Sequence, residues 1–195
     1  MLRMIKQNRG FAGALFLFEA LFLIYNILND RGFYRGVLVQ NANESVAIAF
    51  VAMAQTVPVL MRGLDLSVGA VMTLSACVAS YLLTGSGLQI GFGIFATLAV
   101  GTAFGLMNGL IVVYGRLQPI IATLATGAIA IGLALLLRPQ PGGDVDGDLG
   151  WALTNTVWDF ADTYGWADSG EAWWLAPFGE IPVPLILLIG VAVVV

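Results

Sequence analysis

One short polar stretch between two long apolar runs reads Arg62-Gly63-Leu64-Asp65-Leu66-Ser67-Val68-Gly69-Ala70. A charged side chain at the centre of a membrane helix costs roughly 2.5 to 3.5 kcal/mol, so Asp65 must lie near a membrane surface or face protein interior. Either Asp65 or Ser67 can accept hydrogen bonds from the free N–H groups that open the following helix. Gly63 and Gly69 let the backbone turn and a neighbouring helix approach closely. The stretch therefore predicts the start of a tightly packed membrane helix, and contact with a substrate there is left open.

The composition indicates a membrane protein. Hydrophobic residues make up 59% of the sequence, charged residues make up 10%, and mean hydropathy is +0.90, whereas about 25% of the residues of an average soluble chain are charged. The chain has no His and a single Cys, Cys77, which excludes disulfides within the chain, ordinary zinc sites and Cys–His nucleophilic chemistry. A net charge of −4 without a Lys/Arg cluster argues against nucleic acid. A phosphate-binding Gly-x-x-x-x-Gly-Lys-Ser/Thr loop is also missing, so we expect no ATP hydrolysis by this chain, no cofactor and no enzyme.

A membrane-spanning helix needs about 20 predominantly apolar residues. The sequence offers five complete candidates, and a sixth begins near Ile181 and is cut by the end of the chain. The five are Phe11–Leu28, Val46–Met61, Leu66–Leu83, Ile90–Tyr114 and Pro119–Leu137. Glu19 lies within the first and must face protein or water. We therefore predict an all-α fold, a polytopic transmembrane helical bundle with five complete spans and a truncated sixth. It forms a single domain over residues 1–195 that is incomplete at its C-terminus.

Basic residues set the expected orientation of these spans. Arg3, Lys6 and Arg9 precede the first span, so the positive-inside rule places the N-terminus in the cytoplasm. No small-x-small cleavage site closes the first apolar stretch, which favours an uncleaved helix over a secretory signal. Because the orientation then alternates, the segment 139–180 is expected on the outer side of the membrane.

Small residues at every fourth position predict contact faces between membrane helices, because association in lipid depends on close packing. The fourth span carries Gly93, Thr97, Gly101, Gly105 and Gly109 at this spacing, and the fifth carries Ala122, Thr126, Ala130 and Ala134. We expect Gly101 and Gly105 to pack against neighbouring helices, with a channel-lining face as the alternative. Pro58 and Pro119 predict a kink and a helix start respectively.

The segment 139–180 holds two further patterns. Asp144, Asp146 and Asp148 alternate as in a calcium loop, but Asn155 stands where that loop needs its final Glu. All five Trp of the chain lie here, and Trp gathers at membrane surfaces as an amphipathic anchor. The sequence around Trp158 and Phe160 therefore predicts a short helix lying on the bilayer, with a surface for a binding protein as the alternative.

Several motifs, in the same order, resemble the permease subunits of bacterial ABC importers for ribose, galactose, xylose and related sugars. The matching stretches are Gln55–Leu60, Arg62–Ala70, Gly105–Val112 and Gln118–Thr126. They are similar to a Thr-bearing apolar segment, a Gly-Gly-Ile-Asp-Leu-Ser-Val-Gly-Ser motif, a Gly-x-x-Asn-Gly-x-x-Val element and a Pro-Pro-Phe-Ile-x-Thr-Leu-x-Thr run. The resemblance starts near Phe33 and is thinnest between residues 142 and 180. This chain departs from the family at Arg62, Ile120 and Ile131, where Gly, Phe and often Arg stand.

The resemblance implies a membrane-spanning permease subunit that forms the translocation pathway for a monosaccharide. A periplasmic substrate-binding protein would deliver the sugar, a cytoplasmic ABC ATPase would bind ATP, and a second permease copy would complete a dimer in the lipid of the bacterial inner membrane. Residues 139–180 would then form a periplasmic loop. The residues expected in the pathway are Thr56, Gly63, Asp65, Ser67, Gly69, Asn108, Gly109, Pro119 and Thr123. The alternatives are a permease of the related importers for branched-chain amino acids or nucleosides, and a membrane scaffold fragment that transports nothing.

Overall fold

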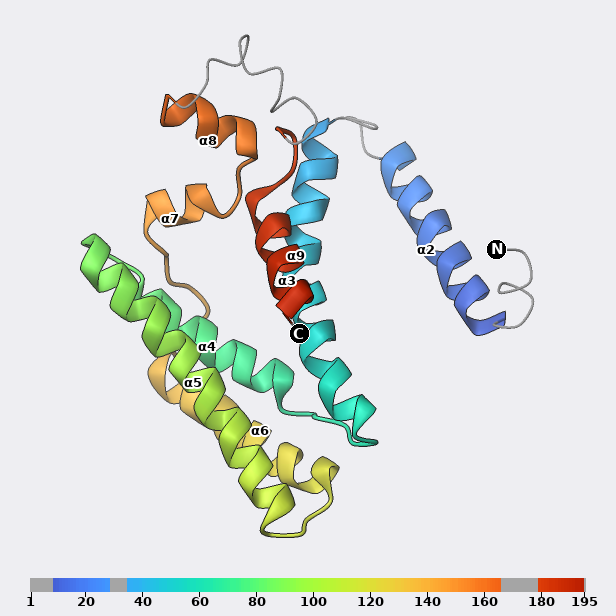
Figure 1. Ribbon diagram of the computed structural model, residues 1–195, viewed down its shortest axis with the longest axis vertical. Helices are drawn as coiled ribbons and strands as arrows, with labels where there is room; N and C mark the ends of the chain where they lie inside the picture. The colour runs from blue at the N-terminus through green and yellow to red at the C-terminus, as the bar shows by residue number, and fades with distance from the viewer. Residues whose placement is uncertain (1–8, 29–34, 166–178, 195) are drawn as a thin grey trace. The chain divides into compact units, whose positions relative to one another are not determined.

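The computed structural model describes residues 9–28, 35–165 and 179–194, and within these ranges the chain forms helices and one isolated β-bridge (Figure 1). The helices are α2 (Arg9–Leu28), α3 (Arg35–Leu60), α4 (Val68–Leu82), α5 (Gly87–Val113), α6 (Pro119–Leu137), α7 (Gly147–Ala152), α8 (Val157–Thr163) and α9 (Val183–Val194). The all-α prediction is confirmed for these residues. Two compact units divide the chain, residues 1–41 and 42–195. In the first unit, Glu19 is an exposed residue of α2.

Each of the five predicted spans coincides with a helix, but not every helix is long enough to cross a bilayer. Three segments of the described chain have the length and composition to cross a bilayer: Val39–Leu60 within α3, all of α5 and all of α6. With 15 residues, α4 is about 22 Å long at 1.5 Å per residue, which is short of the roughly 30 Å hydrocarbon core. It was predicted to start at Leu66 but starts at Val68, because the backbone before it forms contacts outside any helix.

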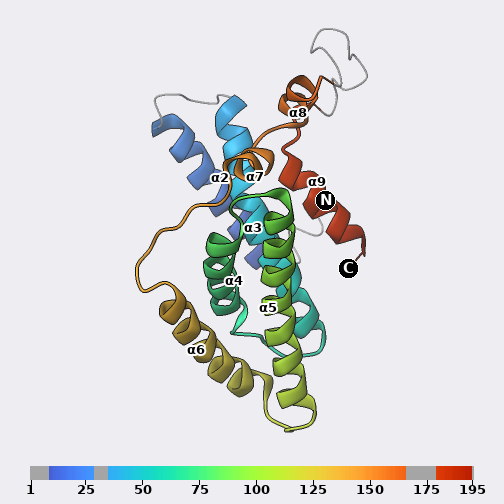
Figure 2. The same ribbon diagram turned by 90° about the vertical axis from the view of Figure 1, so that its left-hand side faces the viewer.

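The second unit is built around α4, which packs against both α5 and α6 (Figure 1 and Figure 2). Leu74 of α4, Phe104 of α5 and the alanines Ala130 and Ala134 of α6 form its buried core. The small side chains of α6 let α4 approach closely, and the predicted stripe on that helix is buried along its length. Cys77 packs against the same core.

Close approach on α5 occurs at one end of its glycine stripe. A Cβ on Gly93 would lie 2.7 Å from the carbonyl oxygen of Leu82 at the end of α4. At Gly101 and Gly105, no atom of the described chain outside their own helix turn lies within 4 Å of such a Cβ. Packing of these two glycines against another helix therefore stays a prediction. Small-residue periodicity marks a face of a helix but does not say which positions are covered.

The segment after α6 is tied to the end of α4. Asp146 donates its backbone N–H to the carbonyl oxygen of Leu83 at 2.7 Å, and its carboxylate accepts from the N–H groups of Asp148 and Leu149 at the start of α7. The alternating aspartates thus include a helix cap, and no three His, Cys, Asp or Glu side chains within the described ranges are placed to hold a metal ion.

The short helix predicted around Trp158 is present as α8. Its N-terminus is fixed by the side chain of Asp159, which accepts from both the N–H and the hydroxyl of Thr156. Phe160 lies between Trp151 and Tyr164, with ring centroids 5.1 and 5.7 Å away. The three remaining tryptophans lie outside the described residues. Contact of this aromatic cluster with a bilayer stays a prediction.

Candidate functional site

The chain leaves the helical conformation between α3 and α4, and this break forms the centre of the candidate site. Arg62 adopts a positive φ of 59°, and Gly63 donates its N–H to the carbonyl oxygen of Pro58 at 2.8 Å. The side-chain amide of Gln55, one turn before the end of α3, donates to the backbone carbonyl of Asp65. Non-helical backbone needs such partners, because its polar groups have none within the segment.

Two further bonds satisfy the N–H groups just before α4. Leu66 donates to the hydroxyl oxygen of Thr123 on α6 at 3.0 Å, and Ser67 donates to Asp65 Oδ1 at 2.8 Å. The Thr123 hydroxyl donates in turn to the carbonyl oxygen of Pro119 at 2.9 Å. Asp65 therefore accepts an N–H at the start of α4, as predicted, whereas the Ser67 side chain forms no cap bond and faces other partners.

The Ser67 hydroxyl belongs to a buried chain of hydrogen bonds that joins three helices. It donates to Asp65 Oδ1 at 2.6 Å and accepts from Asn108 Nδ2 of α5 at 2.8 Å. The hydroxyl of Thr126 of α6 donates to Asn108 Oδ1 at 2.5 Å. Ser67, Thr126 and Asn108 are 1%, 2% and 6% exposed, so water does not compete for these bonds. Asn108 of α5 thus bonds through its amide to Ser67 at the start of α4 and to Thr126 of α6.

Thr126 was not among the residues predicted for the site. Its sequence signal was available, because Thr123 and Thr126 lie about one turn apart on an otherwise apolar helix, and hydroxyl side chains on one helix face often bond to a neighbouring membrane helix. It was assigned instead to the small-residue stripe that packs α6 against α4. The structure shows that it serves both roles, since it is buried and donates to Asn108.

A cavity of about 290 Å³ lies beside this chain of hydrogen bonds. Its lining includes six of the nine predicted pathway residues: Gly63, Asp65, Asn108, Gly109, Pro119 and Thr123. The remaining lining residues are Pro58, Met61, Leu64, Gly105, Val112 and Val113. The wall is thus mostly apolar, with one carboxylate, one amide and one hydroxyl as its polar side chains. Such a surface suits the binding of a small solute rather than the making or breaking of bonds.

Three predicted residues lie outside the cavity lining. Ser67 is buried behind it, in contact with Asp65 and Asn108. The Thr56 hydroxyl donates to the carbonyl oxygen of Ala52 in its own helix, and Gly69 faces open space on α4.

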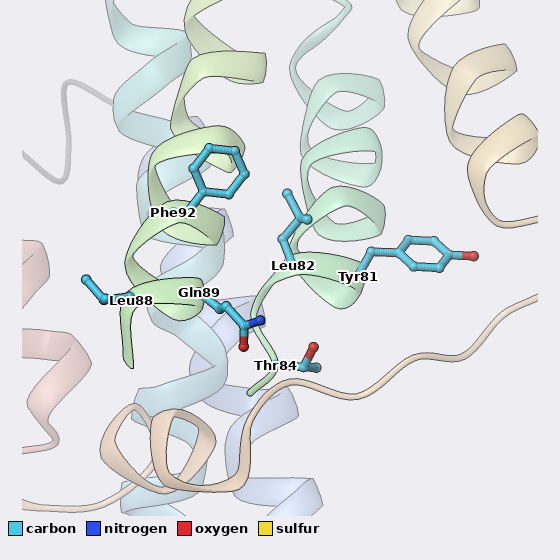
Figure 3. Close-up of a pocket in the computed structure, with 6 residues that line it drawn as sticks. All are labelled: Tyr81, Leu82, Thr84, Leu88, Gln89 and Phe92. Atoms are coloured by element: carbon cyan, nitrogen blue, oxygen red, sulfur yellow. The ribbon is translucent and has the colours of Figure 1, made fainter. Parts of the chain in front are cut away.

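A second hollow of about 330 Å³ lies at the opposite end of α4, where α4 turns into α5. Figure 3 shows Tyr81 and Leu82 on α4 and Leu88 and Phe92 on α5, with Thr84 and Gln89 near the turn between the helices. None of the predicted pathway residues lines it. Tyr81 points away from the α5 side chains in this view, and its hydroxyl donates to the carbonyl oxygen of Leu137 at 2.9 Å.

Long apolar helices around a mostly apolar cavity are the features of a polytopic membrane protein. The chain belongs to the family described as branched-chain amino acid transport system / permease component, which matches residues 37–195. This family groups transport permeases rather than enzymes, and the resemblance found in the motifs is confirmed.

Relatives of the chain are import permeases by name. A fructose import permease protein, FruF, of Bifidobacterium longum is 32% identical over 121 residues, which cover 62% of this chain and 34% of that protein. The autoinducer 2 import system permease protein LsrD of Klebsiella pneumoniae is 28% identical over 165 residues, which cover 85% of this chain and 45% of that protein. LsrD of Escherichia coli K12 is 27% identical over 166 residues, with coverage of 85% and 46%. The chain thus matches less than half the length of these relatives, and no solved structure matches it.

Proposed function

We propose that this chain contributes the solute pathway of a permease subunit in a binding-protein-dependent ABC importer, and that the solute is a monosaccharide. The main support is the single cavity that is lined by six of the nine residues predicted from the motifs. These residues come from α5, α6 and the break before α4, which are distant in sequence. Relatives named as importers of fructose and of autoinducer 2 fit the same branch of transporters.

The cavity lining favours a neutral, hydroxyl-bearing solute over an amino acid. Among the described residues, Asp65 is the one charged side chain of the lining, which includes no Lys or Arg. A branched-chain amino acid carries an ammonium group, which can pair with Asp65, and also a carboxylate, which would find no cationic partner in the described lining. A sugar needs only hydrogen-bonding groups set in an apolar wall, and Asp65, Asn108 and Thr123 provide both donors and acceptors.

The break between α3 and α4 supports a position of the cavity within the membrane. Non-helical backbone at membrane depth is tolerated where it is buried in protein or lines a water-filled cavity. Residues 63 to 65 line the cavity, and neighbouring backbone groups are paired with Gln55 and Thr123. On this proposal α4 is short because the pathway occupies the remaining thickness of the bilayer.

The same proposal includes the partners and placement of the subunit. Energy comes from a separate cytoplasmic ABC ATPase, the solute arrives on a periplasmic binding protein, and a second permease copy completes the pathway. The subunit lies in the bacterial inner membrane with its N-terminus in the cytoplasm and residues 139–180 outside. Five spans of the subunit belong to this chain, formed by α2 to α6, and α4 crosses together with its non-helical leader.

The substitution Gly105→Leu tests the pathway directly. Gly105 lines the cavity and has free space around its Cβ position, so leucine should fill the cavity without separating helices. We expect uptake by the full-length importer to fall at least tenfold while the amount of permease in the membrane stays normal. The solute is the labelled monosaccharide that the wild-type importer takes up fastest from a panel of sugars.

The matched control is Gly101→Leu, one turn earlier on α5, where space is also open but no cavity is lined. This variant should transport like the wild type. Equal loss in both variants, or normal uptake by Gly105→Leu, would place the pathway elsewhere. A wild-type importer that takes up none of the sugars would refute the monosaccharide as solute.

A further inference from the structure

The buried chain of hydrogen bonds ends at a residue that has a choice of acceptor. The Thr126 hydroxyl lies 2.5 Å from Asn108 Oδ1 and 3.2 Å from the backbone carbonyl oxygen of Thr123. A hydroxyl has one proton and two lone pairs, so a full bond to one of these oxygens excludes a full bond to the other. The shorter distance favours the bond to Asn108.

The acceptor that Thr126 uses fixes the direction of the other hydrogen bonds in this buried series. When Thr126 donates to Asn108 Oδ1, the amide nitrogen of Asn108 faces Ser67 and donates to its hydroxyl oxygen. The Ser67 proton then goes to the carboxylate of Asp65, 2.6 Å away. The direction is forced, because an amide nitrogen only donates and an ionised carboxylate only accepts.

The opposite direction is also complete. If Thr126 donates to the Thr123 carbonyl, its oxygen can accept from the Asn108 amide nitrogen after that amide rotates by half a turn. Asn108 Oδ1 then faces Ser67 and receives the hydroxyl proton. Asp65 Oδ1 is left with the Ser67 N–H alone. The two directions differ at the cavity by one hydrogen bond to its carboxylate.

We propose that Thr126 is a positioning residue that sets the direction of hydrogen bonding along this chain and so holds the Asp65 carboxylate in place at the cavity wall. Thr126 does not line the cavity and acts through Asn108 and Ser67, from a different helix. The hydrogen bonds among Thr126, Asn108, Ser67 and Asp65 do not depend on what the protein does, whereas their importance for transport rests on the proposed function.

The experiment observes Asp65 while Thr126 is changed. The full-length permease, in its assembled importer, is prepared with ¹³C-labelled aspartate, and infrared difference spectra against Asp65→Asn identify the carboxylate band of Asp65. Thr126→Val keeps the shape of the side chain and removes the hydroxyl. We expect this variant to shift the Asp65 band, because the Ser67 hydroxyl no longer donates to the carboxylate in a fixed direction. Thr126→Ser restores the hydroxyl and should leave the band at its wild-type position.

Thr102→Val is the matched control, since the Thr102 hydroxyl donates to the carbonyl oxygen of Leu98 in its own helix and takes no part in the buried series of hydrogen bonds. This variant should leave the band unchanged. If Thr126→Val does not fold, Thr126→Cys retains a weak donor and should give a smaller shift in the same direction. An unshifted band in folded Thr126→Val, or an equal shift in Thr126→Ser or Thr102→Val, would overturn the proposal.

Sugar uptake is measured on the same variants and separates this proposal from the proposed function. A shifted Asp65 band with Thr126→Val, together with no uptake of any sugar by the wild type, would keep the positioning role and reject the transport assignment. An unshifted Asp65 band in Thr126→Val, together with normal sugar uptake by the wild type, would reject the positioning role and keep the transport assignment. Where both hold, Thr126→Val loses uptake severalfold and Thr126→Ser retains it.

Discussion

Asp65 shows how a charged residue is accommodated next to long apolar helices. One carboxylate oxygen accepts from both the N–H and the hydroxyl of Ser67, and such charge-assisted bonds are stronger than bonds between neutral groups. The residue is half-buried and lines the cavity. The sequence predicted a helix-opening role for this carboxylate, and the structure adds a second donor that the local pattern alone did not reveal.

The substitutions Asp65→Asn and Asp65→Leu separate hydrogen bonding from charge. An asparagine keeps an oxygen that accepts from Ser67, so the assembled importer should unfold at nearly the wild-type temperature. Leucine leaves the Ser67 hydroxyl and N–H without this acceptor, which costs about 1 to 3 kcal/mol. Thermal unfolding of the purified complexes measures both effects. Equal stability of the Leu and Asn variants would show that the Ser67 bonds contribute nothing to the fold.

Transport by the same pair reports on the charge. Because the proposed role of Asp65 in the fold depends on its acceptor oxygen, we expect Asp65→Asn to retain sugar uptake. A well-assembled Asn variant without uptake would mean that the negative charge itself acts on the solute or on a gate.

At the scale of elements, the contact between α4 and α5 is tightest where the two helices are joined by a short turn. A Cβ on Gly93 would lie 2.7 Å from the Leu82 carbonyl oxygen and 2.8 Å from its carbonyl carbon. Backbone atoms cannot rotate away as the end of a flexible side chain can, so the end of α4 must move if this position is enlarged.

We expect Gly93→Ala to destabilise the permease by about 1 to 3 kcal/mol, the usual range for overpacking. Gly91→Ala is the matched control on the same helix, because no atom of the described chain outside its own helix turn lies within 4 Å of its Cβ position. Alanine there should be neutral or stabilise by up to about 1 kcal/mol through its helix propensity. Thermal unfolding in detergent compares the two variants, and a stable Gly93→Ala would show that the helix ends separate easily.

Sequence periodicity and composition located the helices well because both depend on nearby residues. The predicted span at residues 119–137 has the same limits as α6, and Pro119 explains its start. Leu66 was placed in a helix but lies before it, since its N–H bonds to Thr123, 57 residues away. The contacts of Thr126 with Asn108 likewise depend on how α5 and α6 meet. Such pairings are set by tertiary packing, which a local pattern does not contain.

At the scale of the whole molecule, α4 connects the two ends of the second unit. Its start takes part in the hydrogen bonds around Asp65, and its far end is tied to the segment before α7 through the bond from Asp146 to Leu83. Arg138 at the end of α6 lies 4.5 Å above the centre of the Tyr81 ring, which adds a cation–π contact. The segment before α7 and the end of α6 are therefore both in direct contact with the far end of α4.

The orientation of this helix in the membrane is a prediction from charge and can be tested directly. Arg3, Lys6 and Arg9 precede the first span, and the positive-inside rule then places α7 outside and the turn after α5 inside. Cys77, the one natural cysteine, is replaced by serine. Single cysteines are then introduced as Asp148→Cys on α7 and Tyr114→Cys after α5, both at exposed positions.

An impermeant thiol reagent should label the Asp148→Cys permease in intact cells and the Tyr114→Cys permease only after the membrane is opened. The bond between Asp148 and Asp146 uses the backbone N–H of Asp148, which a cysteine keeps, so the substitution should leave the fold intact. The reverse labelling pattern would show that the subunit has the opposite orientation, with the Asp65 cavity nearer the outer surface. Labelling of both cysteines in intact cells would remove α6 from the set of membrane spans, although it has the length and composition to cross.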